Sequence, residues 1–170
     1  MLAGLLALSA CSASDTSNTQ SALVGTWTYR GNVPSFVNIT LTFKGDKTFT
    51  FVEQIAPFST PAGVMPAAGC VTTDTFSATY AEAVSGEVNT LDWAFTSGTA
   101  NAVSGCTDAS LDSAGTPETA DDLSDRIAQG DAPPMALTYS VTSTTLLLTS
   151  PDDGSFGVGR SPGTTFTRAN

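Results

Sequence analysis

Hydrophobic and polar residues alternate with a period of two along most of the chain after residue 21. The alternating segments are rich in Thr, Val, Phe, Tyr and Leu, which is typical of strands with one buried face. We therefore expect an all-β domain over residues 22–170. The predicted strands are Ala22–Tyr29, Phe36–Phe43, Thr48–Ile55, Val71–Tyr80, Val88–Phe95, Met135–Thr142, Thr145–Ser150 and Gly163–Arg168.

Two short turns fix the register of two predicted hairpins. The first turn is Lys44–Lys47 and the second is Ser143-Thr144. In both hairpins this register places apolar side chains on one face of the sheet. The expected cross-strand pairs are Phe43 with Phe49, Leu41 with Phe51, Ile39 with Glu53, Val141 with Leu146 and Tyr139 with Leu148.

The lengths of the connections favour an up-and-down order of strands, because short and long connections alternate. The short connections are 44–47, 81–87 and 143–144, and the long ones are 30–35, 56–70, 96–134 and 151–162. Cys70 and Cys106 both lie in long connections, and they can bond if Ser97–Gly105 is not another strand that crosses the sheet. We expect an antiparallel barrel of about eight strands, whose interior holds side chains or one small ligand.

Alternation also assigns the inward side chains. The expected inward face comprises Val37, Ile39, Leu41, Phe43, Phe49, Phe51, Phe76, Trp93, Phe95, Leu137, Tyr139, Leu146 and Leu148. Near the mouth, an apolar cup with two carboxylates is expected from Tyr29, Glu53, Asp74, Trp93, Phe95 and Met135. Ligand pockets typically combine apolar walls with a few polar groups that fix orientation. The alternative is that large side chains fill the barrel and leave no cavity.

Two short motifs near the ends of this domain resemble the lipocalin-like family. Gly25-Thr26-Trp27 is similar to the Gly-x-Trp motif of that family's first strand, and Phe166-Thr167-Arg168 is similar to its last strand, whose arginine packs over the tryptophan. The resemblance implies a calycin-type barrel closed at one end by Gly25, Trp27 and Arg168. Gly-Thr-Trp also occurs in avidin-like barrels, but two tryptophans in the chain are few for an aromatic biotin cage.

The first residues resemble the signal peptide of a bacterial lipoprotein. An apolar run, too short to span a bilayer, ends in Leu8-Ser9-Ala10-Cys11, which is similar to a lipobox. The resemblance implies cleavage before Cys11 and acylation of its thiol. Residues 1–10 are then the signal peptide, truncated or degenerate at its start because no Lys or Arg precedes the run. An ordinary signal peptide with an incidental cysteine is the alternative.

The residues after Cys11 extend this interpretation. Residues 11–21 are polar and small, so we expect a flexible tether. Ser12 after Cys11 resembles the pattern for export to the outer membrane, which implies a lipid-anchored protein of the cell envelope in a diderm bacterium. Cys70 and Cys106 form an even pair in a chain addressed to an oxidising compartment, and we expect them to form a disulfide.

Charge and composition narrow the function. A net charge of −10 argues against nucleic acid, because phosphate binding needs clustered Lys and Arg. The sequence contains no histidine, so it has no Ser-His-Asp triad, no Cys-His pair and no imidazole ligand for zinc. We therefore expect no enzymatic activity, no cofactor and no metal. A hydrolase that uses only the carboxylates of Glu53 and Asp74 is the alternative.

The stretch Thr107–Asp131 contains seven carboxylates. Thr116 is expected to cap a short helix there, with Pro117 at its first position and Gly130 as its stop. A narrow apolar stripe would face the barrel from Ala120, Leu123 and Ile127. Calcium binding is the alternative, although the spacing matches no EF-hand loop.

Together these features predict a lipid-anchored, lipocalin-like barrel that binds a small apolar or amphipathic molecule and performs no chemistry. Its expected partners are the membrane, through the lipid anchor, and that ligand. The alternative is a structural or protein-interaction module of the envelope with a filled barrel. Its contact surface would be the acidic stretch and the Pro-rich segment Ala56–Gly69.

Overall fold

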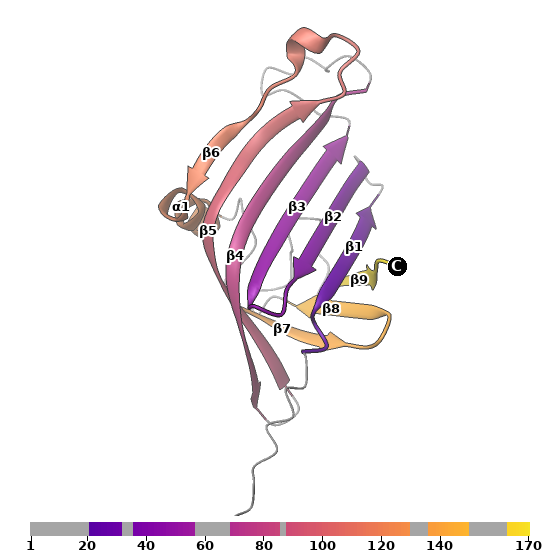
Figure 1. The fold of residues 1–170 in the computed structure, drawn as a ribbon, viewed down its shortest axis with the longest axis vertical. Coiled ribbons are helices and arrows are strands. Elements are labelled where there is room, and N and C mark those ends of the chain that lie inside the picture. The colour runs from indigo at the N-terminus through magenta and orange to yellow at the C-terminus, as the bar shows by residue number, and fades with distance from the viewer. Residues whose placement is uncertain (1–20, 32–35, 57–68, 86–87, 130–135, 150–162) are drawn as a thin grey trace, which may run out of the picture.

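The computed structural model describes residues 21–31, 36–56, 69–85, 88–129, 136–149 and 163–170. These residues form mostly strands, with one α-helix and one 3-10 helix (Figure 1). The strands are β1 Gly25–Gly31, β2 Phe36–Phe43, β3 Thr48–Ala56, β4 Val71–Ser85, β5 Val88–Ser104, β6 Thr116–Thr119, β7 Ala136–Val141, β8 Thr145–Thr149 and β9 Thr164–Arg168. The helices are η1 Ala109–Leu111 and α1 Ala120–Gln129.

Eight of these strands close into an antiparallel barrel. Strands β1 to β5 pair in chain order, β5 pairs with β7, and β7, β8 and β9 follow in order. The barrel closes where β9 pairs with β1. Strand β6 lies outside this circuit and pairs only with β5. The predicted eight-stranded up-and-down barrel with one short helix is confirmed.

The two sides of the barrel differ in height. Strands β1–β5, here called the tall wall, are longer than β7–β9, the short wall (Figure 1). Strand β5 pairs with β7 over Asn89–Asp92 and with β6 over Ser97–Ala100. Helix α1 packs against β5, and its Leu123 is fully buried. The tall wall therefore extends beyond the level at which the short wall ends.

Strands β4 and β5 are longer than the sequence predicts. Strand β4 continues past Tyr80 to Ser85, and β5 continues past Phe95 to Ser104. The expected loops at 81–87 and 96–105 are therefore wrong for the described residues, because the two strands pair from Val71–Ser104 to Ser85–Val88. The two strands satisfy each other's backbone hydrogen bonds in these segments, although the alternation of apolar and polar residues there is weak. The segment Ser97–Gly105 still does not form an additional crossing strand.

Helix α1 starts three residues later than expected. Thr116 and Pro117 lie in β6, where Pro117 pairs with Thr99. An edge strand tolerates proline because its free side needs no N–H donor. The cap is Thr119, whose Oγ1 accepts from the Asp122 backbone N–H at 3.3 Å while the Asp122 carboxylate accepts from the Thr119 N–H at 2.8 Å. This reciprocal pair satisfies donors that the first helical turn leaves free.

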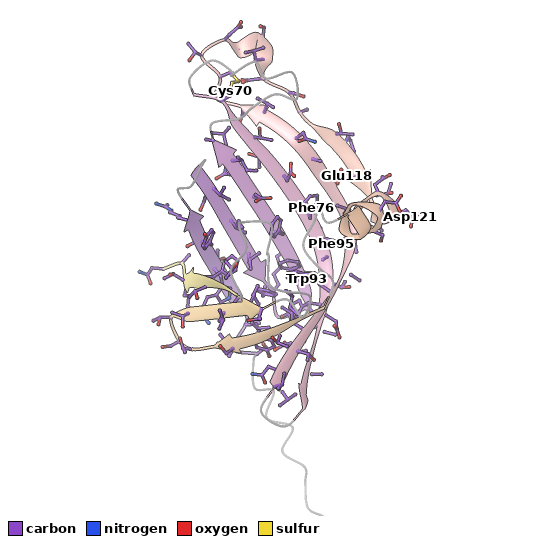
Figure 2. The ribbon with its side chains drawn as sticks, turned by 180° about the vertical axis from the view of Figure 1, so that it is seen from behind. Cys70, Phe76, Trp93, Phe95, Glu118 and Asp121 are labelled. Atoms are coloured by element: carbon purple, nitrogen blue, oxygen red, sulfur yellow. A yellow bond between two sulfur atoms is a disulfide. The ribbon has the colours of Figure 1, made fainter. Side chains whose placement is uncertain are left out.

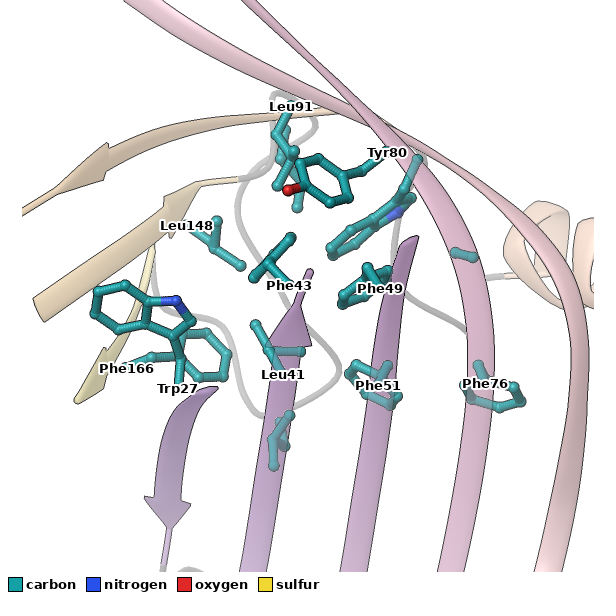
Figure 3. Packing of buried hydrophobic residues seen from close by; sticks show 14 of the residues in the cluster. Trp27, Leu41, Phe43, Phe49, Phe51, Phe76, Tyr80, Leu91, Leu148 and Phe166 are labelled. Carbon is teal, nitrogen blue, oxygen red and sulfur yellow. The ribbon is translucent and has the colours of Figure 1, made fainter. Parts of the chain in front are cut away.

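The predicted registers are confirmed in both hairpins. Phe43 pairs with Phe49 and Ile39 with Glu53, and Tyr139 pairs with Leu148. All the predicted inward residues belong to the hydrophobic core, although Tyr139 is only partly buried. Figure 3 shows this core between the two walls. The core also contains buried residues from outside the predicted inward set, among them Leu23, Ala78, Tyr80, Leu91 and Phe166.

Candidate binding face

The inward side chains of the tall wall form rows across the strands, because each strand is paired in register with the next. One row holds Tyr29, Ile39, Glu53 and Asp74, one from each of β1 to β4. We call it the carboxylate row. Three of the six residues predicted at the mouth, Tyr29, Glu53 and Asp74, are thus brought together by the fold.

Below the carboxylate row lie two rows of mostly aromatic and aliphatic side chains, the lower rows. The first holds Trp27, Leu41, Phe51 and Phe76, and the second holds Phe43, Phe49, Ala78 and Phe95. Their rings pack closely, with centroids of Phe43 and Phe49 4.9 Å apart and those of Phe51 and Phe76 5.7 Å apart. The lower rows therefore form a packed base beneath the carboxylates.

Trp93 and Phe95 lie in this base and not beside Glu53 and Asp74. Trp93 is 3 % exposed and stacks on Phe49 at 4.7 Å, and Phe95 is 6 % exposed and meets Phe76 edge-on at 5.7 Å. In Figure 2, Phe76, Phe95 and Trp93 follow one another along the tall wall, away from Cys70. Their predicted position at the mouth is wrong because β5 extends past Phe95. Met135 lies outside the described residues.

Asp74 occupies a bulge in the tall wall. The register of β4 on β5 shifts between Thr73 and Thr75, and the Asp74 carboxylate accepts from the backbone N–H of Asn101 at 2.7 Å. Asn101 has a φ of 55°, a conformation that asparagine tolerates better than most residues. The bulge holds one oxygen of Asp74 toward β5 and interrupts the ladder next to the carboxylate row.

The other members of the carboxylate row, Tyr29, Ile39 and Glu53, contribute both apolar surface and polar groups. Ile39 is fully buried, whereas Glu53 is half-buried on the same face of β3 as Phe51. The Tyr29 ring lies 6.0 Å from Phe166 and extends over Gly31, where an added Cβ would be 3.0 Å from the Tyr29 hydroxyl. The row combines two carboxylates, a phenol and apolar surface. Such a set can accept hydrogen bonds from a donor or cation while contacting a hydrocarbon group.

The end of the barrel where β1 begins is closed by Trp27 and Arg168. The Arg168 guanidinium lies 4.2 Å from the centre of the buried Trp27 ring and donates to the carbonyls of Val24 at 3.1 Å and Ala22 at 2.9 Å. The indole N–H donates to the Leu23 carbonyl at 2.8 Å. A Cβ on Gly25 would come within 2.6 Å of Arg168, so this glycine makes room for the guanidinium. The predicted stacking of Arg168 on Trp27 is confirmed.

A cluster of hydrogen bonds around a single carboxylate, that of Glu82, lies near the same end and was not predicted from the sequence. Glu82 accepts hydrogen bonds from Lys47 Nζ at 2.6 Å, from Ser21 Oγ at 2.7 Å and from the Tyr139 hydroxyl at 3.0 Å. The cluster joins β4 and β7 to the start of the described chain. Glu82 was missed because its segment, which lacks a clear alternation of apolar and polar residues, was interpreted as a loop and not as the continuation of β4.

These contacts shift the pKa values of the cluster. Burial alone would raise the pKa of Glu82, but its hydrogen bonds from Lys47, Ser21 and Tyr139 lower it below the ordinary value of 4.5. The hydrogen bond to Glu82 raises the pKa of Lys47. Burial, and then the hydrogen bond to Glu82, raise the pKa of Tyr139 to about 12. Near neutral pH the cluster therefore holds an ionised Glu82 with three donors.

Cys70 and Cys106 form the predicted disulfide. Cys70 directly precedes β4 and Cys106 follows β5 by one residue, so the bond closes the β4–β5 hairpin at the end opposite Glu82. The partners and the two connections that hold them were predicted correctly, and these connections meet because β4 and β5 are paired neighbours. Gly69 and Gly105 flank it, both with positive φ values.

Three of the seven carboxylates of the acidic stretch accept hydrogen bonds in local turns and caps. The Asp108 carboxylate accepts from Ser110 at the start of η1, Asp112 accepts from the Cys106 N–H at 3.2 Å, and Asp122 caps α1. Within the described ranges, no group of three or more His, Cys, Asp or Glu residues is arranged to hold a metal ion. A helix that is both long and apolar enough to cross a bilayer is also absent from those ranges.

Comparison of the chain with protein-family models, with curated proteins and with solved structures found no match.

Proposed function

We propose that this protein is a lipid-anchored lipoprotein of the cell envelope whose lipocalin-like barrel binds a small amphipathic molecule at the carboxylate row. Cys11 is the acylated residue, and residues 11–21 connect it to the barrel. The protein performs no chemistry, which agrees with a sequence that lacks histidine. The lipobox-like segment at Cys11 supports the anchor, and the contact of Arg168 with Trp27 supports the lipocalin-like architecture.

The observation that carries the binding proposal is the position of Glu53 beside Asp74 on the inner face, directly above the packed lower rows. Antiparallel partners have Cβ atoms about 4.5–5.5 Å apart, and two like charges at that separation destabilise the sheet. Ionised carboxylates only accept hydrogen bonds, so the two residues place acceptors of negative charge on an otherwise mostly apolar inner face. The pair therefore favours a ligand with a hydrogen-bond donor or a cationic group at its polar end.

A second candidate function is a structural or protein-interaction module with a filled barrel. The observation that favours it is the close packing of Trp93 and Phe95, which turns two of the predicted ligand contacts into core residues. The two functions differ in what Glu53 does. In a binding protein its carboxylate contacts a ligand, whereas in a filled barrel it contacts only other parts of the protein.

The test compares the binding of a cationic amphipathic fluorophore with that of an anionic one, in folded wild-type protein and in Glu53→Gln. We expect the cationic probe to bind more tightly, and Glu53→Gln to weaken it about tenfold, which corresponds to about 1.4 kcal/mol. Asp125→Asn, which removes an exposed carboxylate from α1, is the matched control and should leave affinity unchanged. If neither probe binds, or both variants behave alike, the filled-barrel alternative is favoured.

The anchor is tested separately. Cys11→Ser should move the protein from the membrane fraction to the soluble fraction of its own cells, because acylation requires the thiol. Mass spectrometry of the wild-type N-terminal peptide should show an acylated Cys11. Membrane association that survives Cys11→Ser would contradict the lipoprotein proposal without bearing on the carboxylate row.

A further inference from the structure

The lower ends of β4 and β5 form a ribbon that continues past β3. Strand β7 still pairs with the β5 side of this ribbon over Asn89–Asp92, so among the described residues only its end is two-stranded. Strand β3 pairs with β4 only as far as Thr79, whereas β4 and β5 remain paired to Ser85 and Val88. Figure 1 shows this ribbon extending beyond the body of the barrel. We call residues 81–85 and 88–92 the lower ribbon.

The lower ribbon has an apolar end. Val84 is 71 % exposed and Val88 is 49 % exposed, the two highest values among the large hydrophobic residues that the structure describes as exposed. They come from opposite faces of the ribbon, since Val84 pairs with Asn89 and Val88 with Ser85. The only charged residue between Ala83 and Thr90 is Glu87. The end of the ribbon thus presents an apolar side chain on each of its faces.

The start of the described chain is fixed to this ribbon. Ser21 donates to Glu82 at 2.7 Å, and the same Ser21 accepts from the Leu23 N–H at 3.1 Å. Arg168 then holds the carbonyls of Ala22 and Val24, so the chain from 21 to 24 is firmly attached at this end of the barrel. A tether that leaves from Ser21 therefore leaves from the side of the lower ribbon.

The length of the tether limits how far the ribbon can lie from a membrane. Between Cys11 and Ser21 the chain has ten peptide steps, for which a flexible linker has an r.m.s. span of about 17 Å. From Glu82 to Ser85 the ribbon advances about 10 Å, at about 3.3 Å per residue. If Cys11 is anchored in the bilayer, the end of the ribbon is within the average reach of the surface.

We propose that the lower ribbon rests on the bilayer, with Val84 and Val88 inserted in the interface between headgroups and acyl chains. The inference depends on the proposed acylation of Cys11. The contact would fix the orientation of the barrel, with the lower ribbon toward the lipid and the Cys70–Cys106 end away from it. It relies on apolar contact and not on charge, which suits an acidic protein that an anionic surface repels.

The experiment measures the depth of single labels on the full acylated chain in phosphatidylcholine vesicles. Val84→Cys and Val88→Cys each carry an environment-sensitive fluorophore. The matched control is Leu111→Cys, because Leu111 is 48 % exposed but lies in η1, near the other end of β5. Cys11 is acylated and Cys70 is bonded to Cys106, so the introduced thiol is the one that reacts. All three positions are exposed, and the variants should fold.

We expect a nitroxide carried on the lipid to quench the labels at 84 and 88 at least about three times as strongly as the label at 111, because interfacial side chains lie about 5–10 Å into the headgroup boundary. Equal quenching at the three positions, in protein that floats with the vesicles, overturns the ribbon contact alone. Quenching that appears only at high protein density shows self-association and also overturns it. If the chain is not acylated and does not float with the vesicles, both the proposed anchor and this inference are overturned.

Discussion

The lower rows and the carboxylate row lie on the same strands, and yet they have opposite characters. In the lower rows, aromatic rings stack at 4.9 and 5.7 Å and every side chain is buried. One step up each strand, the inner face presents Tyr29, Glu53 and Asp74. A packed core and a carboxylate-bearing inner face are thus separated within one barrel by two residues of strand. Substitutions below the step should change stability, and substitutions at it should change binding.

The largest expected effect on stability comes from Trp27→Ala. The substitution removes a fully buried indole together with the ring beneath the Arg168 guanidinium, and we expect a loss of about 3–5 kcal/mol in the free energy of unfolding. Denaturant unfolding followed by circular dichroism measures it. Thr28→Ala, on the outer face of the same strand, should cost less than about 0.5 kcal/mol. A loss below about 1 kcal/mol for Trp27→Ala would show that the closed end does not stabilise the barrel.

A smaller effect is expected from Gly98→Ala, at the boundary between the two regions. An added Cβ would lie 2.4 Å from Phe76 Cδ1 and 2.9 Å from the Thr75 carbonyl, so the Phe76 ring must move from its place in the lower rows. We expect a loss of about 1–3 kcal/mol. Gly45→Ala is the matched control, because a Cβ there meets nothing within 4 Å. Equal stability of the two variants would mean that Phe76 repacks freely and that the boundary is not rigid.

The smallest of the three effects is expected from Glu82→Gln, which reduces the ionic hydrogen bonds to Lys47, Ser21 and Tyr139. We expect about 1 kcal/mol at neutral pH, because Lys47 is half exposed and solvent screens the pair. Since folding lowers the pKa of Glu82, the unfolded state binds more protons as the pH falls below about 4.5. The wild-type protein therefore loses this contribution on acidification through the folded pKa.

The measurement for this prediction is the difference in unfolding free energy between the wild type and Glu82→Gln as a function of pH. The difference should be constant near neutrality and shrink below pH 4.5. Asp92→Asn, which removes an exposed carboxylate from the neighbouring strand β5, serves as the matched control variant. A difference that does not change with pH would show that the charge of Glu82 does not stabilise the lower end.

The sequence allowed the closed sheet, two hairpin registers and the core to be predicted because these depend on local alternation. A one-residue slip of β3 would turn Phe49 and Phe51 to solvent, so the register has a single acceptable value. The length of β5 was not predictable in this way. Beyond Phe95 its inward positions are Gly98 and Ala100, which give no hydrophobic signal and form a strand only because β4 and β6 pair with them.

The candidate site was predicted in part for the same reason. Tyr29, Glu53 and Asp74 were brought together because their strands have the expected register, which the short turns define. Trp93 was predicted at the mouth, but its position along the barrel depends on where β5 ends. The pairing of β5 with β4 determines that end. The hydrogen bonds of Glu82 are long-range polar contacts, and the cap at Thr119 is a local one. The alternation of apolar and polar residues predicts neither.

The seam between β1 and β9 has a consequence for the order in which the barrel assembles. Among the described residues, Trp27 pairs with Arg168 and Thr28 with Thr167, and the Ala169 N–H donates to the Thr26 carbonyl at 2.9 Å. Thr28 and Thr167 lie 139 residues apart in sequence. The other neighbouring strands of the barrel lie closer together in sequence, but this seam requires residue 168. A growing chain therefore remains an open sheet with unpaired edges until β9 has been made, and during that interval it is most exposed to aggregation.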